Sequence, residues 1–189
     1  MFRYLVISLL FAFSGSVTAQ IEIPLDVISL KSMYPNFKEL SGDLDNDGVD
    51  DFAAIFSEKT SDGRIYYIVV LKGKPSGTYE FVTKSLNVEY EKMAVEIKNK
   101  SLYVIRFSNT LAQDLSETYQ FKYRDNGYFL IGYEENSYTQ DDAKKFRDSI
   151  NYLTGAEIET EIVGGKTEVI KSRLKEEDRK LLSLEDFSR

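Results

Sequence analysis

Five aspartates are crowded into residues 42–51, which read Gly-Asp-Leu-Asp-Asn-Asp-Gly-Val-Asp-Asp. Carboxylates this close repel one another unless a cation lies between them, and acids at alternate positions can converge on one point if the chain curls around it. Gly48 supplies the positive φ that such a curl requires. Asp50 should then point away. The sequence predicts a metal site made by the side chains of Asp43, Asp45, Asp47 and Asp51 and by the backbone carbonyl of Val49.

The type of ligand atom indicates the ion. Carboxylate and carbonyl oxygens favour calcium, a hard ion that binds about six to eight oxygens, over zinc or copper, which prefer nitrogen and sulfur. An EF-hand is excluded, because its loop needs a glutamate at the twelfth position, and this position is Ala54 when Asp43 is counted as the first. We expect a structural ion, since a catalytic one needs an open coordination position. The alternative is a solvated turn without an ion.

A known type of loop has the same spacing. The pattern Asp-x-Asp-x-Asp-Gly-x-x-Asp, preceded by Gly42 and followed by the apolar residues 52–56, resembles the calcium loop of FG-GAP and VCBS-type repeats. Such loops occur in integrin-type β-propellers and in many secreted bacterial proteins. From about residue 23 to residue 155 the chain is similar to a family of uncharacterised exported bacterial proteins with a single loop of this kind. The resemblance implies a β-rich fold and a calcium site, and it implies no substrate.

The N-terminus predicts export. Arg3 precedes an apolar run at 4–13, and small residues end the segment at Ala19. The run is shorter than the about 20 residues of a membrane span, so residues 1–19 are interpreted as a signal peptide cleaved before Gln20. An uncleaved anchor is the alternative. We expect a periplasmic or secreted protein with no membrane span after cleavage.

The rest of the chain is typical of an all-β domain. A short helix is predicted at 24–34, and the run at 65–71, apolar on both faces, predicts a central strand. The expected strands are 52–56, 65–71, 78–83, 93–97, 102–107, 119–123, 128–133, 146–153, 158–163 and 166–173. They predict a mainly β fold, an antiparallel meander that forms a sandwich or a partial propeller. The single domain should cover 20–173, and the charged C-terminal tail, 174–189, should be helical or loose.

Composition excludes several kinds of chemistry. The chain has no histidine and no cysteine, which removes Ser-His-Asp and Cys-His catalysis, histidine-ligated zinc and thiol redox reactions. Its net charge of −7 makes it a poor binder of nucleic acid. Tyrosine and phenylalanine are abundant but tryptophan is absent, so we interpret the aromatic residues as strand packing rather than a sugar platform.

Three functions remain open. The leading hypothesis is an exported, non-catalytic calcium-binding module with an interaction role and an unknown protein or glycan partner. The second is a periplasmic inhibitor or immunity protein that blocks a secreted enzyme. The third is a glycan hydrolase that uses two carboxylates. Its candidate acids are Glu89, Glu91, Glu134 and Glu135, and no spacing among them singles out a pair.

Overall fold

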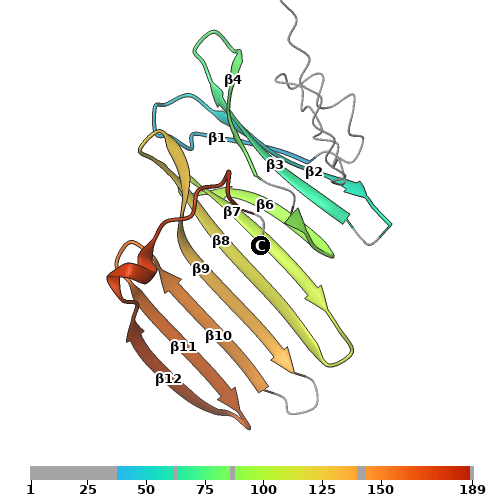
Figure 1. Ribbon diagram of the computed structural model, residues 1–189, viewed down its shortest axis with the longest axis vertical. Helices are drawn as coiled ribbons and strands as arrows, with labels where there is room; N and C mark the ends of the chain where they lie inside the picture. The colour runs from blue at the N-terminus through green and yellow to red at the C-terminus, as the bar shows by residue number, and fades with distance from the viewer. Residues whose placement is uncertain (1–37, 62–63, 86–87, 140–143, 188–189) are drawn as a thin grey trace, which may run out of the picture.

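The computed structural model describes residues 38–61, 64–85, 88–139 and 144–187. Twelve strands in these ranges form two antiparallel sheets (Figure 1), so the prediction of a mainly β meander is confirmed. The predicted signal peptide and the predicted helix at 24–34 lie outside the described residues. Within them, the only helical segment is a short 3₁₀ helix at Glu176–Arg179.

The first sheet carries the acidic loop. Its strands are β1 (Lys38–Gly42), β2 (Asp51–Lys59), β3 (Arg64–Gly73), β4 (Tyr79–Lys84) and β5 (Val88–Glu89). The first four are neighbours in chain order, and β5 pairs with β3 beyond the end of β4. β3 is central, as predicted, and Ile68, Val69 and Val70 are fully buried although they point alternately to the two faces.

The second sheet is a seven-stranded meander. Its strands are β6 (Lys92–Lys98), β7 (Ser101–Asn109), β8 (Gln113–Arg124), β9 (Gly127–Thr139), β10 (Lys144–Asn151), β11 (Ala156–Val163) and β12 (Lys166–Arg173). The predicted turn between β8 and β9 is confirmed, with positive φ at Asp125 and Asn126. The prediction that β10 continues to Leu153 is wrong, because the N–H of Gly155 donates to the Asn151 carbonyl at 2.7 Å and closes a turn there.

The two sheets share a hydrophobic core. Ile55 and Val70 from the first sheet pack in one cluster with Val104, Phe121 and Leu130 from the second. Figure 1 shows the first sheet lying against strands β6–β9 of the second sheet. Strands β10–β12 extend beyond the first sheet. The second sheet therefore has an inner face, which carries the core residues, and an outer face on its other side.

The C-terminal tail belongs to this core, which the sequence did not predict. The N–H of Leu130 donates to the carbonyl of Leu182, and the N–H of Leu184 donates to the carbonyl of Tyr128, both at 2.8 Å. The tail therefore lies beside the first half of β9. Leu184 and Phe187 are 1% and 0% exposed, so these two side chains close the core.

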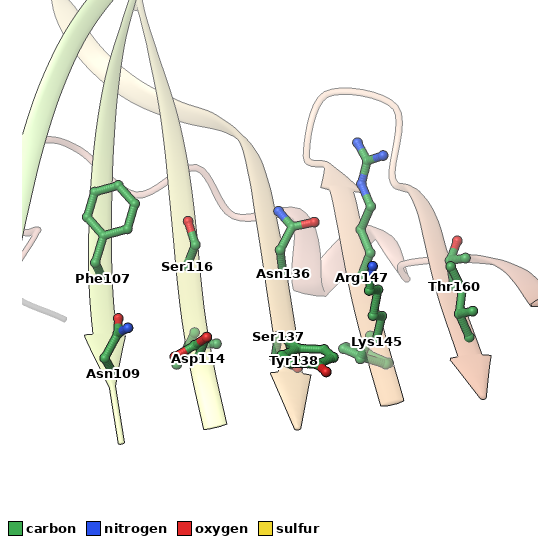
Figure 2. Close-up of a pocket in the computed structure, with 13 residues that line it drawn as sticks. Phe107, Asn109, Asp114, Ser116, Asn136, Ser137, Tyr138, Lys145, Arg147 and Thr160 are labelled. Atoms are coloured by element: carbon green, nitrogen blue, oxygen red, sulfur yellow. The ribbon is translucent and has the colours of Figure 1, made fainter. Parts of the chain in front are cut away.

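The outer face of the second sheet is hollowed. A cavity of about 530 Å³ lies over β7–β11, and Figure 2 shows side chains from all five strands around it. The cavity lies on the face opposite to the first sheet, and it is separate from the acidic loop.

Candidate metal centre

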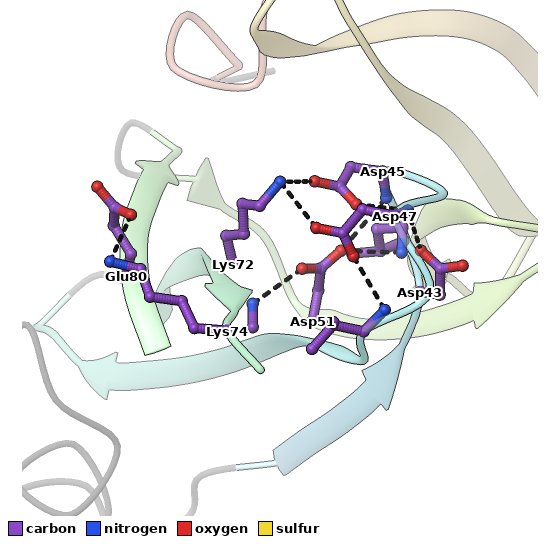
Figure 3. A network of polar contacts seen from close by, with 10 residues as sticks. Asp43, Asp45, Asp47, Asp51, Lys72, Lys74 and Glu80 are labelled. Atoms are coloured by element: carbon purple, nitrogen blue, oxygen red, sulfur yellow. Dashed lines mark hydrogen bonds and ion pairs between the residues drawn. The ribbon is translucent and has the colours of Figure 1, made fainter. Parts of the chain in front are cut away.

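The acidic loop connects β1 to β2. Gly42 and Asp51 pair at the base of this hairpin, and the side chain of Leu44 is buried in the shared core at 2% exposure. Asn46 and Gly48 have φ of 67° and 87°, which bend the backbone between them. Leu44 thus anchors the loop in the core, and Figure 3 shows the side chains of Asp45, Asp47 and Asp51 close together beside Lys72.

Three of the predicted ligands come together. One carboxylate oxygen each of Asp43, Asp45 and Asp51 lies within 4.8 Å of the other two. Calcium–oxygen bonds of about 2.3–2.6 Å place two ligands on opposite sides of the ion roughly 5 Å apart. The spacing of the three oxygens would therefore allow them to bind one metal ion together, and a donor set made only of carboxylate oxygens favours a hard cation.

Asp51 also holds the loop to the end of β3. Its Oδ2 accepts the N–H groups of Leu44 at 2.9 Å and Asp45 at 3.3 Å, and its Oδ1 accepts the N–H of Gly73 at 3.0 Å. Burial raises the pKa of this carboxyl, and the bonds from Gly73 and Leu44 act in the opposite direction. A Cβ at position 73 would lie 2.1 Å from the Asp50 carbonyl oxygen, so the close approach of strand and loop requires glycine here.

The other two predicted ligands, Asp47 and Val49, lie outside this group of carboxylates. Asp47 accepts the N–H of Val49 at 2.9 Å through Oδ1, and its Oδ2 lies 3.0 Å from the Lys72 ammonium. The Val49 N–H and then Lys72 lower the pKa of Asp47. Neither Asp47 nor Val49 belongs to the group of three converging carboxylates. Asp50 is exposed, accepts a bond from Ser41 Oγ at 3.4 Å and is not a member of the group of three.

Two lysines at the loop were missed by the sequence analysis. The Lys72 ammonium contacts Asp45 and Asp47, and hydrogen bonds to both raise its pKa. The Lys100 ammonium lies 3.4 Å from Asp43 Oδ2 and also contacts Asn46. The pairing of Phe52 with Leu71 carries Lys72 to the base of the loop. Only the register of β2 and β3 places Lys72 at the loop, and this register cannot be predicted from the pattern of the sequence alone.

Two of the candidate acids for glycan hydrolysis, Glu134 and Glu135, do not form a pair. Glu134 and Glu135 are successive residues of β9, so their side chains point to opposite faces of the sheet. Glu134 is paired with Arg147 on the outer face, whereas Glu135 accepts a bond from Tyr133 Oη at 2.8 Å. Glu91 is exposed and lies 3.4 Å from the N–H of Asn109. Glu134 and Glu135 therefore cannot flank one glycosidic bond.

Two further findings bear on the membrane and family predictions. Within the ranges that the structure describes, no helix has the length and apolar character that a membrane crossing requires. The likeness of the acidic loop to FG-GAP and VCBS loops stays a prediction. Comparison with protein-family models, with curated proteins and with solved structures found no match to this chain.

Proposed function

We propose that this chain is an exported, non-catalytic calcium-binding module, built as a β-sandwich, whose role is to bind a partner. One observation carries the calcium part of the proposal: the convergence of carboxylate oxygens from Asp43, Asp45 and Asp51 within 4.8 Å. An acidic loop whose backbone is already held by Leu44 and Asp51 is suited to a structural ion, because little chain entropy is lost when the ion binds.

Calcium has to compete with the two lysines. The side chains of Lys72 and Lys100 are 36% and 50% exposed, so both ammonium groups have room to swing into water. An ion bound between Asp43, Asp45 and Asp51 would take over the charge compensation that the lysines supply. The competition should weaken the affinity for calcium, and we expect a dissociation constant of about 10⁻⁴–10⁻³ M, as in extracellular calcium modules.

Thermal unfolding of the mature chain, from Gln20 onward, tests the proposal. At 1 mM calcium, binding to the folded state alone adds about 0.4–1.4 kcal/mol to the free energy of unfolding. The Tm should therefore be roughly 1–5 °C higher in calcium than in chelator. Asp45→Asn should abolish this rise, because Asp45 belongs to the converging group. The matched control, Asp50→Asn, should keep the rise, because Asp50 contacts Ser41 and lies outside the converging group.

Two results of this experiment would contradict the proposal. If the Tm of the wild type does not change with calcium up to 10 mM, the loop is an acidic turn whose charge is neutralised by Lys72 and Lys100. A rise that survives in Asp45→Asn would place the ion elsewhere on the chain.

A further inference from the structure

The cavity on the outer face of the second sheet is lined by a row of aligned side chains. The strand register places five residues opposite one another across β7–β11, namely Phe107, Ser116, Asn136, Arg147 and Thr160. Figure 2 shows this row, with a second row beside it that contains Asn109, Asp114, Tyr138 and Lys145. Four gaps between strands of about 4.8 Å make the first row roughly 19 Å long, which suits an extended ligand.

The row offers side-chain chemistry rather than backbone chemistry. All five strands are interior strands of the sheet, so their backbone groups already serve neighbouring strands and no ligand can be added as a further strand. The hydroxyl groups of Ser116 and Thr160 and the amide of Asn136 can donate and accept hydrogen bonds. Phe107 and Tyr138 add partly exposed rings. Hydroxyl, amide and aromatic groups together match a ligand that has both hydroxyl groups and apolar C–H faces.

The charge of the outer face selects among such ligands. Its lysines and arginines on β6–β10 are Lys92, Lys98, Lys122, Arg124, Lys145 and Arg147, and the acids among them are only Glu96, Asp114 and Glu134. At the cavity, Arg147 is paired with Glu134, and Asp114 lies in the same row as Lys145, two strands away across Tyr138. Lys145 forms no ion pair within the described part of the chain, and its ammonium lies 6.0 Å from the centre of the Tyr138 ring. An anionic group on the ligand would provide the partner that Lys145 lacks.

We propose that this cavity binds an acidic saccharide chain, one that carries carboxylate groups. Phe107 and Tyr138 are then exceptions to the interpretation of the aromatic residues as strand packing, because their partly exposed rings pack against the C–H faces of sugar residues. Ser116, Asn136 and Thr160 bond to hydroxyl groups. Lys145 pairs with a ligand carboxylate. The inference gives a partner class to the proposed binding role, and it is independent of the calcium loop, which lies on the first sheet.

Calorimetric titration of the mature chain with a galacturonate hexasaccharide tests the inference. Binding should be detected, and Lys145→Gln should weaken it by about tenfold, as expected for one charge-assisted contact. Tyr138→Ala should also weaken it. The matched control is Lys122→Gln, a lysine on the same face outside the cavity, which should change the affinity by less than about twofold. All these positions are at the surface, and circular dichroism checks that each variant is folded.

Two further ligands separate the alternatives. The fully methyl-esterified hexasaccharide, which has no charge, should bind about tenfold more weakly than the acid form. A hexaglutamate peptide should not compete. Equal binding of the peptide would indicate a site for acidic polypeptides and would overturn the inference. Absence of saccharide binding, or an affinity that Lys145→Gln leaves unchanged, would overturn it as well. Chelator should leave saccharide binding unchanged, so failure of this site and failure of the calcium site are observed separately.

Discussion

Asp51 holds more backbone donors than the other two aspartates of the group, Asp43 and Asp45, each of which accepts the N–H of Asp47 at 3.1 Å. It is 1% exposed, and its two oxygens accept three backbone N–H groups from Leu44, Asp45 and Gly73. A carboxylate has about four acceptor sites, so it can hold these donors and still offer an oxygen to an ion. Asp45 makes its main contact with Lys72 instead. The loop should therefore depend on Asp51 for folding and on Asp45 for binding.

We predict that Asp51→Asn destabilises the protein even without calcium. The asparagine oxygen can replace only one carboxylate oxygen, and its NH₂ group would face a buried N–H donor. The expected loss is about 1–3 kcal/mol of unfolding free energy, the cost of a buried polar group without a partner. Asp45→Asn should cost less in chelator, because its remaining oxygen can still accept the Asp47 N–H, and the Lys72 ammonium that it loses is 36% exposed and can turn into water. Urea unfolding of both variants in chelator measures the difference, and equal losses would contradict the account.

Lys72 should oppose calcium binding. Its ammonium contacts Asp45 and Asp47, so it competes with an ion for the same carboxylates. We predict that Lys72→Gln lowers the Tm in chelator, because the acids then repel one another, and enlarges the rise in Tm that calcium produces. Lys74→Gln is the matched control, since the Lys74 ammonium pairs with Glu80 at 2.8 Å rather than with the loop. A smaller rise in Lys72→Gln than in Lys74→Gln would show that Lys72 does not compete.

The tail should be part of the folding unit. The ring of Phe187 is fully buried and meets Tyr119 and Phe121 edge-on, with ring centres 4.9 and 5.3 Å away. We predict that Phe187→Ala lowers the free energy of unfolding by about 3–5 kcal/mol, as for other buried phenylalanines. Lys180→Ala, an exposed change in the same tail, should have little effect. Chemical denaturation of the two variants measures this, and a stable Phe187→Ala would mean that the tail only rests on the core.

A row of acids on the inner face of the second sheet should limit stability at neutral pH. The register places Glu135, Asp148 and Glu159 side by side on β9, β10 and β11, and like charges on directly opposite residues are destabilising. Asp148 Oδ1 is buried and has no hydrogen-bond partner among the described residues. Burial, and then the charges of Glu157 and Glu159, raise the pKa of Asp148.

The direction of the pH effect follows from this raised pKa. The folded state binds the proton more tightly than the unfolded state, in which an aspartate titrates near about 3.9, so the folded state loses stability as the pH rises through and above that value. We predict that Asp148→Asn raises the free energy of unfolding at pH 7 by up to about 1 kcal/mol. The gain should disappear below about pH 4. Asp114→Asn, whose cross-strand partners Asn109 and Tyr138 carry no charge, is the control. Thermal unfolding of both at pH 7 and pH 3.5 measures the effect, and a gain that persists at pH 3.5 would contradict it.

The strands that the sequence predicted are those with a local signal. The turn between β8 and β9 is predicted by Asp125, Asn126 and Gly127, and β3 is predicted by the apolar run at 65–71. β8 and β9 extend beyond their apolar parts, because cross-strand pairing continues through polar residues such as Glu117 and Glu135. The tail was missed because Leu182 and Leu184 form too short a pattern to indicate a strand, and their partner, β9, is far away in sequence.

The candidate site likewise has residues that the local sequence predicts and residues that only the tertiary structure shows. The convergence of Asp43, Asp45 and Asp51 follows from their spacing in one short loop, which local sequence shows. Lys72 and Lys100 reach the loop from other strands and turns, and only tertiary structure reveals them.

At the scale of the whole molecule, the two proposed sites lie on different sheets. The acidic loop closes the first hairpin beside the shared core, and the cavity lies on the outer face of the second sheet. The inner face of that sheet carries the row of acids, whereas lysines and arginines predominate on its outer face. We expect the mature chain to bind calcium and a saccharide independently, because none of the residues that line the cavity belongs to the loop.

Calorimetric titration of the metal-free mature chain with calcium tests the central claim most directly. We predict one ion per chain with a dissociation constant of about 10⁻⁴–10⁻³ M. Asp45→Asn should bind about tenfold more weakly or not at all, as expected when one charged contact is lost, and Asp50→Asn should bind like the wild type. A wild-type chain that produces no heat of binding up to 10 mM calcium, or an Asp45→Asn variant that binds as well as the wild type, would contradict the claim that Asp43, Asp45 and Asp51 hold the ion.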